Sequence, residues 1–193
     1  MNAGEESVMT ESSYILRGDV IEGGRILLRP ITMEDTPLIV RWRNMESVRR
    51  NFIFRETFTA EMHTRWMQTR VAAGEVLQYI IVERESGRSV GSVYFRDMDR
   101  KNRSAEYGIF IGEESARGRG IGSETAHVFT DYGFQELGLH RISLRLLADN
   151  VQAEKSYSNA GFEREGLFRD MVFLDGEYRD VLFMAKLNRE AER

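Results

Sequence analysis

The sequence predicts a single α/β domain, and three observations support this fold class. The chain has 193 residues, which is the length of one ordinary domain. Its middle is rich in apolar, β-branched runs separated by turn signals. A strand at 104–111, an amphipathic helix that begins near residue 121 and a strand at 141–146 follow in the order of a βαβ unit with parallel strands. We expect one domain over residues 14–193, preceded by a disordered polar tail at residues 1–13.

The first third of the chain predicts a hairpin followed by two helices. The Gly23-Gly24 pair separates two strand-like segments. Thr32 or Asp35 can cap the first helix, whose start Pro37 leaves open, and Thr59 can cap the second. We expect the hairpin over residues 19–29 and the first helix over residues 32–44. A short basic turn follows at 46–51, an aromatic loop at 52–58 and the second helix at 59–71.

The rest of the chain predicts six strands and two further helices. Gly138 ends the helix that begins near residue 121, Asn150 caps the last helix, and Asp175-Gly176 is a hairpin turn. The strands are expected over residues 76–84, 89–95, 104–111, 141–146, 162–168 and 178–187.

Composition excludes several classes of function. The net charge of −4 argues against nucleic acid as a partner, and the absence of cysteine removes disulfides and thiolate metal sites. His63, His127 and His140 have no metal-ligand spacing, so we expect no metal. No apolar run is long enough to span a membrane, and the acidic start does not resemble a signal peptide. A cytoplasmic enzyme is the expectation.

The glycine-rich turn after the strand at 104–111 predicts an anion site. It has the pattern Arg117-x-x-Gly120-x-Gly122 and opens a helix, whose first backbone N–H groups and dipole attract an anion. Glycines let the anion approach without a Cβ in the way. The pattern lacks the Gly-Lys-Ser/Thr of a P-loop and the G-x-G-x-x-G of a dinucleotide fold, and a plain surface turn is the alternative.

A second pattern lies downstream: Asn150-x-x-Ala153-x-x-x-Tyr157-x-x-x-Gly161-Phe162. The two patterns in this order resemble the signature of GNAT-superfamily N-acetyltransferases, and the resemblance covers about residues 76–187. It implies a central mixed, mostly antiparallel sheet of about seven strands with helices on both faces. It also implies acetyl-CoA as co-substrate and a primary amine, small molecule or peptide, that attacks the thioester directly.

The resemblance assigns coenzyme contacts to three segments. Backbone groups of Ile109, Phe110 and Ile111 would pair with the pantetheine arm. The parallel strands that end at Ile111 and Leu146 would diverge, so that the thioester lies between them. Asn150 would bond the pantetheine as well as capping its helix. The pyrophosphate would be held by Arg117, Gly118, Arg119, Gly120, Ile121, Gly122 and Ser123. For Arg117 a purely structural pairing is an equal alternative.

Two residues match the chemistry that the resemblance implies. An amine acceptor is mostly protonated at neutral pH, so a base must take its proton, and the departing thiolate benefits from an acid. Tyr157 matches the family's proposed acid, and Glu106 lies where some relatives place a base. The alternatives are an aromatic that packs on the sheet for Tyr157 and a solvated strand carboxylate for Glu106.

The acceptor is the least determined part. Arg29-Pro30-Ile31, Trp42-Arg43-Asn44 and residues 175–180 resemble the branch that contains ribosomal-protein N-terminal, polyamine and nucleotide-amino-sugar acetyltransferases. Four arginines of residues 42–55 oppose one glutamate, which favours an acceptor with an anionic group, bound by Arg43 and Arg49. We expect a nucleotide-linked amino sugar ahead of a protein N-terminus. A polyamine acceptor, a solvated arginine face, a non-catalytic acetyl-CoA-binding module and a homodimer stay open.

Overall fold

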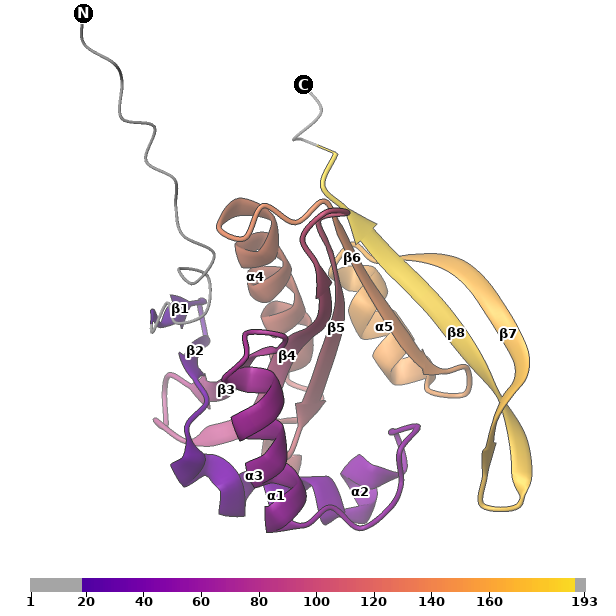
Figure 1. The fold of residues 1–193 in the computed structure, drawn as a ribbon, viewed down its shortest axis with the longest axis horizontal. Helices are drawn as coiled ribbons and strands as arrows, with labels where there is room; N and C mark the ends of the chain where they lie inside the picture. The colour runs from indigo at the N-terminus through magenta and orange to yellow at the C-terminus, as the bar shows by residue number, and fades with distance from the viewer. Residues whose placement is uncertain (1–18, 190–193) are drawn as a thin grey trace, which may run out of the picture.

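The computed structural model describes residues 19–189, which are built around one sheet of eight strands (Figure 1). The strands are β1 Ile21–Glu22, β2 Ile26–Pro30, β3 Leu77–Glu83, β4 Ser89–Asp99, β5 Ser104–Ile111, β6 Arg141–Leu147, β7 Glu163–Leu174 and β8 Glu177–Leu187. Their order is β1-β2-β3-β4-β5-β6-β8-β7, and β5–β6 is the parallel pair in this otherwise antiparallel sheet. The predicted mixed, mostly antiparallel sheet is confirmed, with one strand more than the seven expected.

Helices cover both faces of the sheet, as predicted. In Figure 1, α1 and α3 lie in front of the sheet, and α4 and α5 lie behind it. The helices are α1 Thr36–Asn44, α2 Glu46–Arg49, α3 Ala60–Trp66, α4 Ile121–Gln135 and α5 Val151–Asn159, with short turns η1 Met33–Asp35, η2 Met67–Val71 and η3 Glu114–Ala116. The predicted basic turn at 46–51 is largely the short helix α2. The expected disordered tail lies outside the described residues.

Both predicted capping residues act at the start of the helical segment. The Asp35 carboxylate accepts hydrogen bonds from the Thr32 backbone N–H at 2.9 Å and from the Arg29 guanidinium at 2.6 and 2.8 Å. Burial raises the pKa of Asp35, but Arg29 and Thr32 outweigh it and hold the pKa below its ordinary value. Pro37 lies in the first turn of α1, where a missing N–H costs no hydrogen bond. The entry into α1 is therefore fixed by one ion pair and a reciprocal cap.

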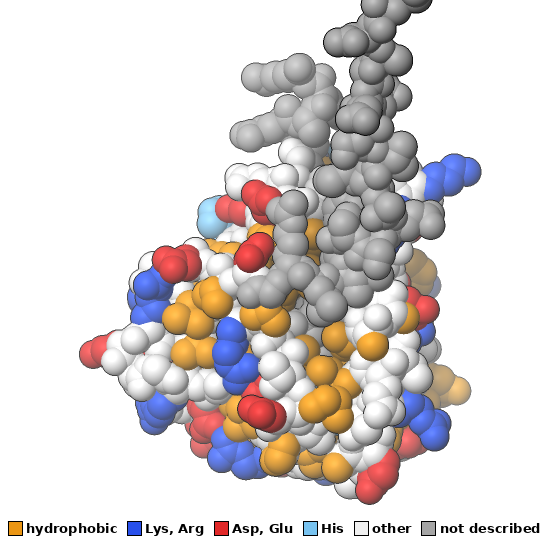
Figure 2. Space-filling model, turned by 60° about the vertical axis from the view of Figure 1, so that its left-hand side comes forward, with side chains coloured by type: hydrophobic (Ala, Val, Ile, Leu, Met, Phe, Trp, Pro, Cys, Tyr) orange, Lys and Arg blue, Asp and Glu red, His pale blue; other side chains and the backbone are white. Residues whose placement is uncertain are grey.

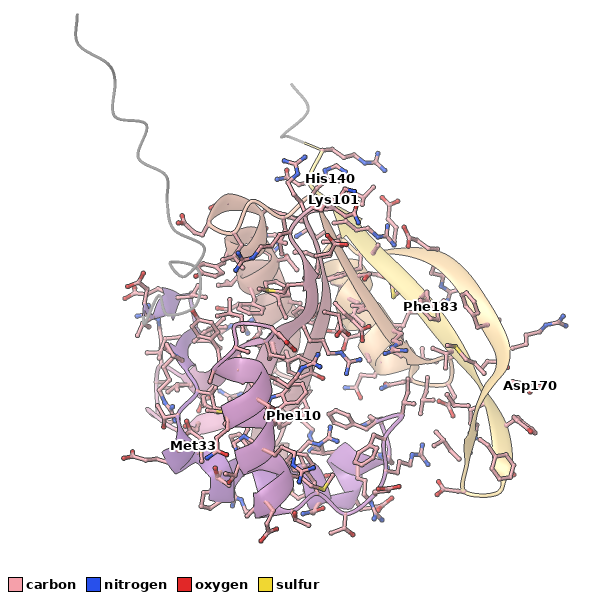
Figure 3. The ribbon with its side chains drawn as sticks, in the orientation of Figure 1. Met33, Lys101, Phe110, His140, Asp170 and Phe183 are labelled. Atoms are coloured by element: carbon pink, nitrogen blue, oxygen red, sulfur yellow. The ribbon has the colours of Figure 1, made fainter. Side chains whose placement is uncertain are left out.

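Each face of the sheet has its own core. On the α4 and α5 side, Phe95 stacks on Phe129 with 4.2 Å between ring centroids. On the α1 and α3 side, Trp42 meets the edge of Phe110 at 6.1 Å, and Phe110 is seen beside these helices in Figure 3. Consecutive side chains of β5 thus enter different cores, because strand residues alternate between faces. A ligand bound along β5 would therefore have the helices α1 and α3 on one side and α4 and α5 on the other.

Charges of both signs are interspersed over the face turned forward in Figure 2, with apolar side chains between them. None of the helices within residues 19–189 combines the length and apolar character that a membrane span requires.

His63 makes the fold sensitive to acid. This α3 residue is 1% exposed, and its Nδ1 lies 2.8 Å from Thr36 Oγ1. Burial lowers the pKa of His63 from 6.5, against the opposing field of Asp35. The unfolded chain therefore takes up this proton before the folded chain does. Stability from this residue is complete above the unfolded pKa and falls as the pH drops below it.

We expect His63→Gln, which cannot titrate, to weaken the loss of stability that sets in as the pH falls below the unfolded histidine pKa of about 6.5. Urea unfolding of both proteins at each pH measures the two slopes. Parallel slopes would remove His63 as the source of the acid sensitivity.

Candidate active site

The parallel strands β5 and β6 separate part-way along their length. They pair from Ser104 with Arg141 to Glu106 with Ser143, and then both strands continue without pairing to each other. On its other side β5 stays paired to β4 as far as Ile111. One edge of β5 is therefore open beyond Glu106. The separation expected beside Ile111 and Leu146 is present.

The open edge exposes backbone groups of alternate residues. Gly112 donates its backbone N–H to the Val90 carbonyl at 2.8 Å. This bond determines which residues of β5 direct their backbone N–H and C=O groups toward β4. Since the bonds of an antiparallel pair alternate, Ile109 and Ile111 point toward the gap and Phe110 points back to β4. Of the three residues expected to pair with pantetheine, this geometry favours Ile109 and Ile111.

Arg117 occupies part of this edge. Its Nε and Nη2 donate to the Ile111 carbonyl at 3.1 and 3.0 Å, and Nη2 also donates to Gly112 at 3.2 Å. The structural pairing weighed for Arg117 is thus present. No side chain within residues 19–189 bonds the N–H or C=O of Ile109 or the N–H of Ile111, so these three groups could pair with a ligand.

The glycine turn has the backbone that an anion cradle needs. Gly120 is the N-cap of α4 and has φ 77°, in the left-handed region that favours glycine, and Gly118 has φ 71°. The first amides of this 15-residue helix, from Ile121 to Ser123, follow the end of β5 after a nine-residue connection that contains η3. A Cβ on Gly120 would lie 3.0 Å from an Arg25 guanidinium nitrogen, so this side of Gly120 is filled by Arg25 and is not the open anion position.

Arg25 is a residue that the sequence analysis missed. Its side chain holds Glu124 of α4 at 2.7 Å and donates to the Arg119 carbonyl at 2.6 Å, which ties β2 to the glycine turn. Arg119 in turn pairs with Glu83 at 2.5 Å. Its guanidinium is therefore committed to the protein, so the amides of the turn, and not the Arg119 side chain, would face a phosphate. A small hollow of about 210 Å³ adjoins this corner, lined by Gly24, Arg25, Glu83, Arg84, Glu85, Arg119 and Ile121.

Asn150 and Tyr157 are both on α5, behind the gap. Asn150 Oδ1 accepts from the Ala153 N–H at 3.2 Å, so the predicted cap is confirmed. The Tyr157 ring packs edge-on against Tyr107 at 6.0 Å and Phe162 at 5.9 Å. Burial, and to a smaller extent Tyr94, raises the pKa of Tyr157 well above its ordinary value. Its hydroxyl has no hydrogen-bond partner among residues 19–189, so Tyr157 is a protonated donor without a protein acceptor.

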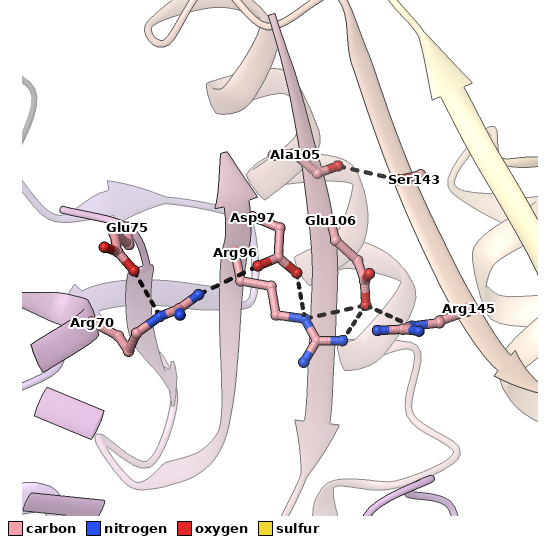
Figure 4. A network of polar contacts seen from close by, with 8 residues as sticks. All are labelled: Arg70, Glu75, Arg96, Asp97, Ala105, Glu106, Ser143 and Arg145. Atoms are coloured by element: carbon pink, nitrogen blue, oxygen red, sulfur yellow. Dashed lines mark hydrogen bonds and ion pairs between the residues drawn. The ribbon is translucent and has the colours of Figure 1, made fainter. Parts of the chain in front are cut away.

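Glu106 lies on the opposite face of β5, at the last paired position before the gap (Figure 4). It forms an ion pair with Arg96 of β4 and one with Arg145 of β6 at 3.2 Å. All of these bonds reach Oε1, and no described residue bonds Oε2. The carboxylate is not a solvated surface group, and its second oxygen is open. Two guanidinium groups thus lie against this one carboxylate, and Arg96 also pairs with Asp97 at 3.6 Å.

The two arginines expected to bind the acceptor differ in their surroundings. Arg43 of α1 lies 3.6 Å from the Phe52 ring centroid and 5.2 Å from that of Phe58. No carboxylate within residues 19–189 pairs with it, and burial lowers its pKa while leaving it charged. Arg49 instead pairs with Glu46 on the surface of α2 at 2.8 Å. Only Arg43 is a partly buried cation without a counter-charge.

Comparison with known proteins decides the family. Residues 25–163 match the acetyltransferase (GNAT) domain family. The chain belongs to this family. It is 28% identical over 159 residues to spermidine N(1)-acetyltransferase of Escherichia coli K12, covering 82% of this chain and 84% of the relative.

Two solved structures have the same fold as this GNAT protein. Spermidine N-acetyltransferase from Vibrio cholerae, in complex with CoA and spermine, has a TM-score of 0.80 at 22% identity and covers 88% of this chain and 99% of its own. Mycobacterium smegmatis RimJ in complex with CoA-disulfide has a TM-score of 0.78 at 21% identity, and the match covers 92% of this chain and 91% of RimJ. Membership of the acetyltransferase (GNAT) domain family makes the chain an acyltransferase, an N-acetyltransferase with acetyl-CoA as co-substrate.

The residues present fit this co-substrate. An open strand edge at Ile109 can pair with an amide-bearing arm, and a glycine N-cap at Gly120 leaves helix amides for a pyrophosphate. Acetyl-CoA supplies the thioester, whose C–S bond breaks as the C–N bond forms. Tyr157, which keeps its proton, is a suitable donor to the leaving sulfur.

We expect Gly120→Val to weaken acetyl-CoA binding at least about tenfold, because valine is strained at φ 77° and would turn the first amides of α4 away from the phosphates. Calorimetric titration with acetyl-CoA measures the affinity. Gly87→Val is the matched control, since Gly87 has φ 66° in the β3–β4 turn and open space around it. Equal affinity in a folded Gly120→Val protein would refute the cradle.

We expect Tyr157→Phe to lower kcat about ten- to a hundredfold, since it removes one acid and keeps the ring packing. Acetyl-CoA affinity should stay within about twofold of wild type, because the uncharged thioester sulfur is a weak hydrogen-bond acceptor and the donor matters mainly when the thiolate departs. Steady-state kinetics and the same titration test both parts. Unchanged kcat would leave Tyr157 a packing role.

Proposed function

We propose that this N-acetyltransferase acts on a primary amine that carries an anionic group nearby, and that an acidic protein N-terminus is its acceptor class. The observation that carries the proposal is the unpaired Arg43. A partly buried guanidinium without a counter-charge is unfavourable unless a ligand supplies one. Its two aromatic neighbours fix its plane, which suits forked hydrogen bonds to a carboxylate or phosphate.

The charges around the open gap support the same class. Arg43, Arg96 and Arg145 come from three different elements, and the two carboxylates that pair with these arginines are Glu106 and Asp97, which lies 3.6 Å from Arg96. An acceptor with several ammonium groups would meet a net positive surface here and would be repelled. This disfavours a polyamine, although relatives named for spermidine are 28% identical to this chain.

Relatives named for ribosomal proteins offer the class that agrees with this charge. A putative ribosomal N-acetyltransferase of Bacillus subtilis is 30% identical over 106 residues, 55% of this chain and 57% of the relative. A protein N-terminus has one amine and can carry acidic residues directly after it. We place it ahead of the nucleotide-linked amino sugar favoured on sequence grounds, which has the same kind of charge. A cytoplasmic location stays a prediction.

The test compares initial rates on an N-terminal peptide with two acidic residues, the same peptide with alanines, spermidine and a UDP-linked 4-amino sugar. We expect the acidic peptide to exceed the neutral peptide by at least about tenfold in kcat/KM, the size of one charged hydrogen bond. Arg43→Met, which keeps the stem between the two rings, should abolish that preference.

Arg65→Met on the exposed face of α3 is the charge-matched control and should keep the preference. Arg49→Met should also keep it, because Glu46 already balances Arg49. A higher rate on spermidine than on the acidic peptide would overturn the proposed class of anionic acceptors. A higher rate on the UDP-linked sugar would keep that class and make the sugar nucleotide, and not the protein N-terminus, the acceptor.

A further inference from the structure

Tyr94 crosses strand β5 at the start of the gap. It stands opposite Gly108 in the β4–β5 pair, two residues beyond the last β5–β6 pair. A Cβ built on Gly108 would lie 2.3 Å from Tyr94 Cζ and 2.5 Å from its hydroxyl oxygen. The ring therefore occupies the space that a side chain at Gly108 would fill. Glycine at position 108 is what allows the hydroxyl to lie over β5.

The Tyr94 hydroxyl has open hydrogen-bonding capacity. No hydrogen bond is formed by it among residues 19–189, although its ring is held edge-on by Trp66 at 6.5 Å. The charged groups that face it are Arg96 on its own strand, Arg43 from α1, Glu106 from β5 and Arg145 from β6. Burial, the largest effect, raises the pKa of Tyr94 above its ordinary value. The phenol therefore stays neutral while its oxygen can accept a hydrogen bond.

The two faces of β5 are not equally accessible to an acceptor. On the α4 side, Tyr107, Phe129 and Phe162 fill the space with packed aromatic rings. On the α1 side, Gly108 carries no side chain, Tyr94 lies over it, and Arg96 and Glu106 form an ion pair on the same face (Figure 4). An amine that attacks a thioester held along Ile109 must therefore arrive past Tyr94.

We propose that Tyr94 is an acceptor-binding residue: its hydroxyl oxygen accepts an N–H hydrogen bond from the amine and turns the nitrogen lone pair toward the thioester carbonyl. Tyr94 gains and loses no proton in this role. The amine forms the C–N bond and releases its proton to a base, and the sulfur leaves with the C–S electron pair. The proposal rests on acetyl transfer at this gap and is independent of whether the acceptor is anionic.

The opposite placement of Tyr157 agrees with this role. Tyr157 approaches β5 from α5, on the face that is filled by packed rings, while Tyr94 lies on the α1 face. One phenol thus stands on the side of the leaving sulfur, and the other stands on the side of the incoming nitrogen. Holding the nucleophile and the leaving group on opposite sides of a carbonyl is what direct transfer requires.

The experiment uses Tyr94→Phe, which removes the hydroxyl alone, with two acceptors. One is the acidic peptide, and the other is hydroxylamine, a small amine that is largely uncharged at neutral pH and needs no arginine contact. We expect kcat/KM for both acceptors to fall about tenfold, the effect of one lost hydrogen bond. The acetyl-CoA affinity and the slow hydrolysis of acetyl-CoA without acceptor should stay within about twofold of wild type.

Two further variants separate positioning from packing. Gly108→Ala should reproduce the acceptor defect, because its Cβ would displace the Tyr94 ring. Tyr132→Phe, which removes a phenol hydroxyl on α4, should keep wild-type kcat/KM and serves as the control. The shape of the pH–rate profile should be the same for Tyr94→Phe as for wild type, because a neutral phenol takes no part in the titration.

The possible failures are distinguishable. Wild-type kcat/KM for both acceptors in Tyr94→Phe would overturn the proposal, as would an equal loss in acceptor-free hydrolysis. A changed pH profile would also overturn it by making Tyr94 a proton-transfer group. If hydroxylamine reacts more slowly with Tyr94→Phe but normally with Arg43→Met, the role of Tyr94 in binding the amine is supported. That result would hold even if the anionic acceptor class proves wrong.

Discussion

The separation of β5 from β6 is the feature on which the rest of the site depends, and the fold stabilises it from both sides. The end of β5 is held toward α1, where a Cβ on Gly112 would lie 2.2 Å from the Trp42 ring. Trp42 Nε1 also donates to Glu113 at 2.8 Å, and Arg117 binds the Ile111 carbonyl. On the other side β6 stays paired to β8 as far as Leu147. Neither strand can close the gap without breaking these contacts.

An open strand edge inside a sheet is costly unless something pairs with it, because backbone N–H and C=O groups need partners. The protein meets part of this need itself by placing the Arg117 guanidinium on the Ile111 carbonyl. The groups at Ile109 are left without such a side-chain partner. A ligand with its own amides completes them, so the same feature that weakens the sheet creates affinity for a pantetheine-like arm.

The coenzyme side of the site was largely predictable from the sequence, because backbone atoms form it. A left-handed residue at the start of α4 demands glycine, and Gly120 at φ 77° satisfies that demand. The Asn150 cap and the strand–helix–strand order have similar local causes. Less visible was Arg25, whose partner Arg119 lies 94 residues away and which follows from the packing of β2 on the glycine turn.

The acceptor side could not be predicted to the same depth. Arg43 and Arg49 look equivalent in the sequence, yet one lies between two aromatic rings and the other pairs with Glu46 on the surface. Tyr94 and Gly108 gave no signal, because their contact depends on the register of β4 against β5.

This difference between the two sides has a physical origin. Backbone-mediated binding fixes residue types, because only glycine leaves the amides accessible, and it therefore leaves a readable spacing in the sequence. Side-chain-mediated binding needs only that a charge or hydroxyl reach the right point, and many positions on different elements can supply it. The acceptor side proposed above draws on α1, β4, β5 and β6, and the salt bridge from Arg55 to Asp175 joins the loop after α2 to the turn of the β7–β8 hairpin. Acceptor choice can thus change through single side chains while the gap and the glycine turn stay the same.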